Sequence, residues 1–462
     1  MPASPVTMPG MSELHPLALR FASAMQALPP AATVRVGLSG GMDSVSLLAL
    51  LSDYQRAHNP PWQLAAIHVN HGLQSEAHEW QAFCEQLCRK LDIPLNVRKV
   101  TVSSTGSLEA AAREARYGAF SQVLTAQEVL VLAQHLDDQL ETLLLRLMRG
   151  SGPTGLSGMP RSRPLGQATL FRPLLDCKRD ELLAYAQANA LEWKEDPSNS
   201  NIEFDRNYCR QRVLPQLAER WPGYRDSWLK SQSLLAESNV LLTELAAADL
   251  QSIREDEGGS LNLSKLQNLS QPRQRNLLRH WLGGLGVQEP GWNVLQQLSK
   301  EVIPAGNDSK AFVEFDEISL RVAGGRLQAL RLPALPGEQG QHWNAVENGQ
   351  LHLPDNGALL AAPVMGQGLG RIHADALEIR YRRGGESIRL PGRPTKSLKK
   401  LLQEEGYAPW LRERLPLLYE GERLVCIPGF GPLTECAAKP DEPGIVIDWQ
   451  APQFAVRPQS DQ

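Results

Sequence analysis

The residues best suited to chemistry form one short turn, made of Ser39, Gly40, Gly41, Met42, Asp43 and Ser44. Apolar and polar residues alternate before it, which predicts a short strand, and leucines recur at helical spacing from Val45 onward. At such a junction the glycines let the backbone approach phosphate oxygens, and the unpaired N–H groups of the helix favour negative charge. The sequence therefore predicts a phosphate-binding loop.

Asp43 puts a carboxylate where a phosphate is expected, so a cation must lie between the two. Mg²⁺ and a substrate ammonium are both open alternatives. No Lys-Ser/Thr pair follows the glycines, which excludes a Walker A loop. The six positions instead resemble the Ser-Gly-Gly-x-Asp-Ser signature of the PP-loop ATP pyrophosphatases, which cleave ATP between the α- and β-phosphates. The alternative is a plain polar turn between strand and helix.

A second group combines an imidazole with three carboxylates at the start of another helix. His135, Asp137, Asp138 and Glu141 follow an apolar run over 129–133 that predicts a buried strand. The acids are three or four residues apart and so share a helix face. They could hold Mg²⁺ or deprotonate an amine nucleophile. Ordinary helix capping by Asp137 is the alternative.

Two further groups of residues could bind anions. Arg113 and Arg116 lie one helical turn apart and could clamp a phosphate or a carboxylate, although a solvated face with Glu–Arg pairs fits equally well. Asp196 and Asn199 belong to a turn that leads into Arg206 and the pattern Arg-Asn-x-x-Arg. This segment could bind an anion or close over the site, and an exposed turn with an exposed helix is the alternative.

Positive charge is concentrated near the C-terminal end, although the whole chain has a net charge of −4. Residues 380–414 hold ten basic and four acidic residues. Lys396, Lys399 and Lys400 lie on one side of a predicted helix whose other side carries leucines. A helix packed through its leucines would offer these lysines to a nucleic-acid backbone. A merely solvated face is the alternative.

The order of the predicted elements indicates how these groups meet. Strands and helices alternate over the first 150 residues, which predicts an α/β fold with a parallel sheet and helices on both faces. Ligands of such sheets bind at the carboxyl ends of strands, where the phosphate turn, His68 and residues 134–141 all lie. Residues 150–168 predict a glycine- and proline-rich loop, either a lid or a mobile linker. The expected helices are 13–28, 75–92, 108–125, 137–149, 178–190 and 207–220, and the expected strands are 34–38, 64–69, 95–102 and 129–133.

The 462 residues suggest about three domains at ~150 residues each. Residues 1–222 form the nucleotide-binding α/β domain. Residues 223–335 predict a mainly helical domain with helices at 226–250, 272–283 and 291–302 and two short strands within 311–330. A linker at 333–349 precedes a small α+β domain at 350–455.

The composition and the cysteines indicate the compartment in which the protein works. Hydrophobic residues make up 42% and charged residues 21%, as in ordinary folded soluble proteins. The six cysteines are scattered without Cys-x-x-Cys, so neither a disulfide framework nor a metal site at Cys84 and Cys88 is expected. No signal peptide and no apolar run of ~18 residues is found. These features predict a protein of the reducing cytoplasm that does not enter a membrane.

Taken together, the motifs resemble the tRNA(Ile)-lysidine synthase family over nearly the whole chain. The resemblance lies in the phosphate turn and in residues 68–73, 136–142, 195–199, 392–402 and 409–416. Two positions depart from it: Gln134 stands where the family often has His, and Phe204 where Tyr is common.

The resemblance implies a reaction. ATP adenylates the C2 carbonyl oxygen of the wobble cytidine in the CAU anticodon of tRNA(Ile) and releases pyrophosphate. The ε-amino group of free L-lysine then attacks C2 and expels AMP to leave lysidine, which switches decoding from AUG to AUA. It implies ATP binding by the turn and His68, catalysis by Asp43, Asp137 and Arg113, and Mg²⁺ at Asp43. Substrate contacts are implied for Arg116, Asp138, Glu141, Asp196, Asn199, Arg206, Lys396, Lys399 and Lys400. Oligomeric state stays open, with a homodimer as one alternative.

Three other functions compete. A PP-loop enzyme that thiolates tRNA usually needs paired or catalytic cysteines, and none is suitably placed. An amidotransferase-type synthetase would need a glutaminase domain. A tRNA-binding module with a degenerate ATP site would release no pyrophosphate when tRNA, lysine and ATP are present.

Overall fold

The computed structural model describes residues 15–72, 77–101, 108–254, 259–305, 311–337 and 341–456. The chain divides into two units, Met1–Val240 and Leu241–Gln462. Within the described ranges, no helix is long and apolar enough to cross a lipid bilayer. The three-domain division stays a prediction.

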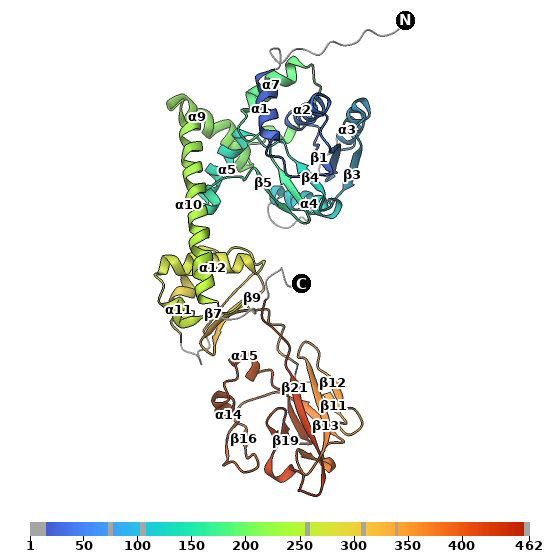
Figure 1. Cartoon of the computed structure of the whole chain (residues 1–462), viewed down its shortest axis with the longest axis vertical. Helices are drawn as coiled ribbons and strands as arrows, with labels where there is room; N and C mark the ends of the chain where they lie inside the picture. The colour runs from blue at the N-terminus through green and yellow to red at the C-terminus, as the bar shows by residue number, and fades with distance from the viewer. Residues whose placement is uncertain are drawn as a thin grey trace. The chain divides into compact units, whose positions relative to one another are not determined.

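A six-stranded sheet organises the first unit (Figure 1), with strand order β3-β2-β1-β4-β6-β5. The first five strands in this order pair in parallel, and β5 pairs antiparallel with β6 at the edge. The bounds are β1 (Thr33–Gly37), β2 (Gln63–Asn70), β3 (Leu95–Lys99), β4 (Glu128–Val131), β5 (Ser162–Leu165) and β6 (Ala168–Phe171). The predicted parallel sheet and its four strands are confirmed, whereas β5 and β6 were not predicted.

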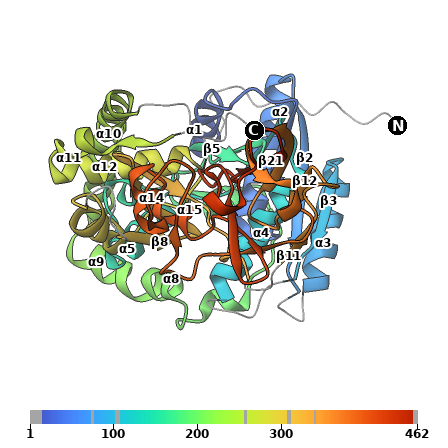
Figure 2. The ribbon, with the colours of Figure 1, turned by 90° about the horizontal axis from the view of Figure 1, so that it is seen from below.

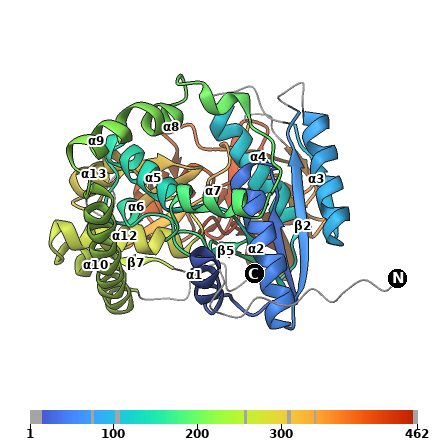
Figure 3. The same cartoon turned by 90° about the horizontal axis from the view of Figure 1, so that it is seen from above.

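Helices cover both faces of this sheet, as predicted. On one face pack α1 (Pro16–Met25), α2 (Met42–His58), α3 (Ala77–Leu91) and α7 (Arg179–Ala188) (Figures 1 and 3). On the other face α4 (Leu108–Val123) packs through Phe120, and Leu124 just after it, against Ile67 and Leu130. All four residues of β4 are buried, because helices exclude water from both of its sides.

Shorter helices follow the last strands. They are α5 (Leu136–Met148), α6 (Pro153–Leu156), a 3-10 turn at Pro197–Ser200, α8 (Asp205–Tyr208), a π-helical turn at Cys209–Val213, α9 (Leu214–Arg220) and the long α10 (Tyr224–Ile253). The predicted helix at 207–220 is therefore three consecutive helical segments, with the π turn in the middle.

The stretch 150–168 is not a loop throughout, so this prediction was wrong where α6 and β5 form. Gln139 of α5 clamps the backbone of Met159, donating to its carbonyl at 2.9 Å and accepting from its N–H at 2.7 Å. Arg146 donates to the carbonyls of Gly155 and Gly158. Side chains of α5 thus replace the backbone partners that this glycine-rich sequence lacks.

The second unit begins with helices on a small antiparallel sheet of order β7-β10-β9-β8. The helices are α11 (Leu263–Gln267), α12 (Gln271–Gly284) and α13 (Trp292–Gln297), followed by a π turn at Leu298–Val302. The strands are β7 (Leu261–Asn262), β8 (Phe312–Phe315), β9 (Ile318–Ala323) and β10 (Arg326–Leu330). The predicted helices are confirmed, but two strands within 311–330 were too few, because Gly324 and Gly325 turn the chain between β9 and β10.

The C-terminal part is α+β, as predicted. A five-stranded sheet contains β11 (Gln341–Trp343), β15 (Leu377–Arg380), β18 (Leu417–Glu420), β19 (Arg423–Ile427) and β20 (Gly431–Pro432). A four-stranded sheet contains β12 (Gln350–His352), β13 (Ala358–Met365), β14 (Leu369–Gly370) and β21 (Pro443–Gln450), and a pair joins β16 (Ser387–Ile388) to β17 (Lys396–Ser397). Two 3-10 turns occupy Arg371–His373 and Thr434–Cys436. Helices α14 (Leu398–Glu404) and α15 (Pro409–Arg412) lie near each other (Figures 1 and 2).

Candidate active site

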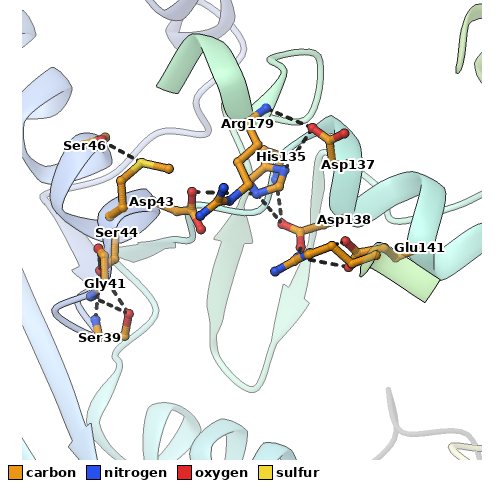
Figure 4. Close-up of polar contacts among 12 residues, drawn as sticks. Ser39, Gly41, Asp43, Ser44, Ser46, His135, Asp137, Asp138, Glu141 and Arg179 are labelled. Atoms are coloured by element: carbon orange, nitrogen blue, oxygen red, sulfur yellow. Dashed lines mark hydrogen bonds and ion pairs between the residues drawn. The ribbon is translucent and has the colours of Figure 1, made fainter. Parts of the chain in front are cut away.

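The phosphate turn is closed by its own serines (Figure 4). Ser44 Oγ donates to the Gly41 carbonyl oxygen at 3.0 Å and accepts from the Ser39 N–H at 3.2 Å. The two serine hydroxyls are 3.0 Å apart. Gly40 has φ +89°, and a Cβ there would lie 3.2 Å from Cys84 Sγ. Only glycine fits this position without strain, and α2 begins one residue after Gly41 with its N–H groups open.

His68 is fixed beside the turn. Its Nδ1 lies 2.9 Å from the Leu38 carbonyl oxygen, and because a carbonyl only accepts, Nδ1 carries the proton. Burial lowers the pKa of His68, and the charge of Arg116 lowers it further, although the Leu38 contact opposes this. His68 therefore presents a neutral imidazole at the end of β2, with Nε2 as the ring nitrogen that can accept a hydrogen bond.

His135 joins the turn to the acidic group on α5 (Figure 4). Its Nε2 lies 3.8 Å from Asp43 Oδ1 and 3.6 Å from Asp138 Oδ2, and its Nδ1 lies 3.9 Å from Asp137 Oδ2. Only 1% of its surface is exposed. Burial lowers the pKa of His135, but the three carboxylates outweigh burial and leave that pKa raised. The structure thus brings Asp43, Asp137 and Asp138 around one imidazole, whose two nitrogens have no hydrogen-bond partner among the described residues.

Asp43 keeps one unsatisfied atom in this arrangement. Its Oδ1 is buried and has no hydrogen-bond partner among the residues that the structure describes. A buried carboxylate oxygen is costly unless something binds it, so this atom is suited to a cation.

Asp137 does not cap its own helix. Asp138 does so, because its Oδ2 accepts from the His135 N–H at 3.0 Å. Asp137 instead accepts from the backbone N–H of Arg179, at the start of α7, at 2.9 Å and from the Arg225 guanidinium at 3.1 Å. The capping alternative for Asp137 is therefore wrong for α5.

Asp138 and Glu141 bind two arginines, one from α8 and one from the π turn after it. Glu141 is fully buried and accepts from Arg206 Nε at 2.7 Å and from Arg210 Nε at 2.6 Å. Asp138 accepts from Arg206 at 3.0 Å and from Arg210 at 3.3 Å. Burial raises the pKa of Asp138, but His135 and Arg206 outweigh it and lower that pKa. Three predicted substrate residues therefore bind one another, and Arg210, noted in the sequence only as the end of a longer pattern, completes their network.

The turn at Asp196 and Asn199 is attached to the same segment. Asp196 Oδ1 caps the 3-10 turn by accepting from the Ser198 N–H at 2.8 Å. Asn207 donates to the carbonyls of Ser198 and Asn201, each at 2.8 Å. The charge of Asp196 also acts on His71, which places this turn near the end of β2.

Arg113 and Arg116 are exposed on α4. Within the described part of the chain, neither forms an ion pair with a carboxylate, so the alternative of Glu–Arg pairing finds no support there. The charge of Arg116 lowers the pKa of both His68 and His71, which lie at the carboxyl end of β2.

Lys399 and Lys400 follow the predicted amphipathic pattern, whereas Lys396, predicted on the same helix, lies in β17 just before α14 begins. Leu398, Leu401 and Leu402 of α14 are buried, while Lys399 and Lys400 are exposed. Lys396 is held by Glu404 at 2.7 Å. Two of the three predicted lysines are thus available at the surface.

No metal cluster exists among the residues that the structure describes, counting groups of three or more His, Cys, Asp or Glu. Burial raises the pKa of the Cys84 thiol to about 12 and of the Cys88 thiol to about 11, so both stay protonated in the core.

Three families match the chain in succession. Residues 15–217 match the PP-loop domain, residues 261–328 the TilS substrate binding domain, and residues 377–449 the TilS substrate C-terminal domain. The chain is 41% identical over 451 residues to a tRNA(Ile)-lysidine synthase of Pseudomonas aeruginosa, covering 95% of this chain and 98% of that protein. It is 39% identical over 424 residues to one of Coxiella burnetii, covering 90% and 93%. Among solved structures, a tRNA thiolase of Methanococcus maripaludis covers 48% of this chain and 77% of its own, with 19% identity and a TM-score of 0.42.

Proposed function

The chain belongs to the tRNA(Ile)-lysidine synthase family of ligases that act on tRNA, and we propose that it joins free L-lysine to C2 of the wobble cytidine in the CAU anticodon of tRNA(Ile). ATP is converted to AMP and pyrophosphate by way of an adenylated tRNA. The product, lysidine, switches decoding from AUG to AUA. The cytoplasm, where such a tRNA works, is the proposed location.

The chemistry of the two substrates requires both the phosphate turn and the acidic group on α5. The C2 carbonyl oxygen is a poor leaving group, and adenylation converts it into AMP, which leaves readily. The ε-ammonium of lysine has a pKa near 10.4 and must lose a proton before its nitrogen can attack. A phosphate site must therefore lie next to a carboxylate that holds and deprotonates an amine.

One observation carries the proposal: His135 contacts Asp43 of the phosphate turn and Asp137 and Asp138 of the acidic group, each within 4 Å. The buried imidazole of His135 lies between the two groups at one edge of the sheet, where ligands of parallel sheets bind. The N–H groups at the start of α2 and the hydroxyls of the turn bind the ATP phosphates, and His68 accepts a hydrogen bond beside them.

Mg²⁺ fits at Asp43. This ion usually binds one or two protein carboxylates together with substrate phosphates, and Asp43 offers a buried oxygen that no described residue hydrogen-bonds. Mg²⁺ bound there would neutralise charge on the ATP phosphates. The protein itself fixes the carboxylate, because α2 begins at Met42 and holds Asp43 in its first turn.

We assign the lysine ammonium to the carboxylates of α5. The Arg179 N–H and the Arg225 guanidinium donate to Asp137 and hold its carboxylate in place, and a carboxylate at this position can hold the ammonium and take its proton. We assign further contacts with the substrate to Asp138, Glu141 and Arg206, which bind one another beside Asp137, and to Asp196 and Asn199 of the neighbouring turn. Arg113 and Arg116 hold an anionic group of a substrate.

The C-terminal lysines contact the tRNA backbone in this proposal. Lys399 and Lys400 are exposed, and Lys396 lies on the same segment. Contacts with phosphates are independent of sequence and weaken as salt rises, so they position the RNA rather than identify it.

Mass spectrometry of unmodified tRNA(Ile) with a CAU anticodon tests the proposal. The tRNA is incubated with the protein, ATP, Mg²⁺ and lysine, and pyrophosphate is measured in parallel. We expect a mass gain of one lysine less one water, dependent on both lysine and ATP. A gain of sulfur would favour a thiolase, and no gain with no pyrophosphate would leave only a tRNA-binding role.

A further inference from the structure

Four arginines gather around Tyr117 on the first unit and together form the Tyr117 arginine cluster. The guanidinium of Arg113 lies 5.0 Å from the centre of the Tyr117 ring, and that of Arg163 lies 5.2 Å from it. Arg116 and Arg172 complete the cluster, since Arg116 precedes Tyr117 in α4 and the Arg172 N–H donates to the Arg161 carbonyl at 2.8 Å, beside β5 with its Arg163. Two come from α4, one from β5 and one from the residue after β6, so three elements converge at this ring.

Arg172 is the unusual member because it is buried. Only 2% of its surface is exposed, and its guanidinium donates to Gln134 Oε1 and to the Pro160 carbonyl, the latter at 2.8 Å. Both acceptors are neutral. Burial lowers the pKa of Arg172, and the charges of Arg163 and Arg113 lower it further.

No carboxylate among the described residues balances the positive charge of the cluster. Within the residues that the structure describes, none of its four arginines forms an ion pair with a carboxylate, although most buried charges in proteins are paired. Like charges around one ring repel one another, and the buried member cannot be screened by water. An arrangement of this kind is stabilised when an anion binds to it.

The position of the cluster along the sheet indicates which anion binds to it. Arg172 follows Phe171, whose carbonyl accepts from the Leu132 N–H at 3.0 Å, so Arg172 lies at the carboxyl ends of β6 and β4. β1, which leads to the phosphate turn, is the next strand. Adjacent strands are about 4.8 Å apart, which puts the cluster roughly 10 Å along the sheet edge from that turn.

We propose that the Tyr117 arginine cluster binds phosphodiester groups of the anticodon loop beside the wobble base. This deepens the proposed function and rests on it for the identity of the RNA. The ATP phosphates already have the open N–H groups and hydroxyls of the turn. Arg113, Arg116 and Arg163 reach the surface and can contact the RNA backbone, while Arg172 supplies a fixed charge beneath them.

Binding of an anticodon stem–loop RNA to the full-length protein tests the proposal. Fluorescence anisotropy is measured over a series of salt concentrations without ATP or lysine, so the result does not depend on lysidine formation. Arg163→Gln and Arg172→Met are compared with Arg89→Gln, which removes an exposed arginine from the last turn of α3, near the opposite edge of the sheet.

We expect Arg163→Gln to weaken RNA binding about tenfold, the loss of one charge-assisted contact. The slope of log Kobs against log salt should become less steep by about 0.7 to 1. Arg172→Met should weaken RNA binding similarly, since the fixed charge beneath the surface arginines is removed. Arg89→Gln should change neither quantity.

An unchanged salt slope in Arg163→Gln would overturn the proposal. So would intact RNA binding combined with weaker ATP binding, because the anion would then be the nucleotide. Should Arg172→Met fail to fold, Arg163→Gln still decides, since its side chain is half-buried at the sheet edge and its described hydrogen bond goes to the neighbouring Pro164 carbonyl. Loss of lysidine formation with normal RNA binding would count against the proposed reaction and, if the salt slope of Arg163→Gln falls as expected, would leave this site in place.

Discussion

Replacing Glu141 by Gln tests whether the arginine–carboxylate network holds the active site together. Glu141 is fully buried and accepts three hydrogen bonds, at 2.7 Å from Arg206 and at 2.6 and 3.1 Å from Arg210. Gln keeps the shape of the side chain but removes its charge. Its amide N–H₂ would also face a guanidinium, so at least one of these bonds is lost.

The size of the expected loss of stability follows from the burial of Glu141. Breaking one side of a buried ion pair costs about 3–5 kcal/mol. The arginines keep Asp138 as a partner, and 25% and 33% of their side chains are exposed, which allows water to replace part of the loss. We therefore expect a loss near the lower end, about 3 kcal/mol. For a unit of this size that corresponds to a decrease in Tm of roughly 6–12 °C.

Thermal and urea unfolding of the full chain measure this effect. Glu219→Gln is the matched control, because Glu219 is exposed on α9 and should change stability by less than about 0.5 kcal/mol. The double variant Glu141→Gln with Arg210→Gln should lose less than the sum of the single variants, with a coupling of more than about 1 kcal/mol. A loss below about 1 kcal/mol for Glu141→Gln, or additive effects in the cycle, would refute the reasoning.

Three further predictions concern other parts of the first unit. Gly40→Ala should raise the KM for ATP about tenfold in a pyrophosphate assay, because φ is +89° and the new Cβ would lie 3.2 Å from Cys84 Sγ; an unchanged KM would show that the turn tolerates a side chain. Asp43→Asn should lower pyrophosphate release by about 100-fold, since a charged group at the ATP phosphates is lost, while circular dichroism stays unchanged; near-normal release would exclude Asp43 from the chemistry. Glu128→Gln should destabilise the protein by about 2 kcal/mol at neutral pH, because Glu128 accepts from Arg35 and from the Thr125 N–H. Burial raises the pKa of Glu128, but these donors outweigh burial and lower that pKa. The stabilisation by Glu128 is therefore present above the ordinary pKa of glutamate and is lost as pH falls through the lowered pKa. Urea unfolding at neutral and acidic pH should show that the difference in stability between variant and wild type vanishes in acid.

The phosphate turn could be predicted from sequence because everything that shapes it is local. Ser39 and Ser44 contact each other across five residues, and Gly40 needs only its own backbone freedom. The same holds for the parallel sheet, whose apolar strands and intervening helices are each recognisable over a short window. The resemblance of the later motifs then identified the family, which the similarity of nearly the whole chain confirms.

Strands β5 and β6 were missed because they are short and lie within or just after a stretch rich in glycine and proline. Their strand geometry depends on pairing with β4 and with each other, and their own residues give only a weak preference. The same reason applies to β7, which has two residues and is defined by its pairing with β10.

By itself the sequence determined which residue types stand at each functional position and which short segments form the elements that carry them. Only the tertiary structure decided which of these residues meet. It places His135 between Asp43 and Asp137, and it brings Arg206 onto Glu141 across 65 residues of chain. It also places Arg172 beside Tyr117, with no carboxylate among the described residues to pair with it. The physical reason is that local backbone preferences act over a few residues, whereas charge pairing and burial depend on distances in space that the sheet order sets.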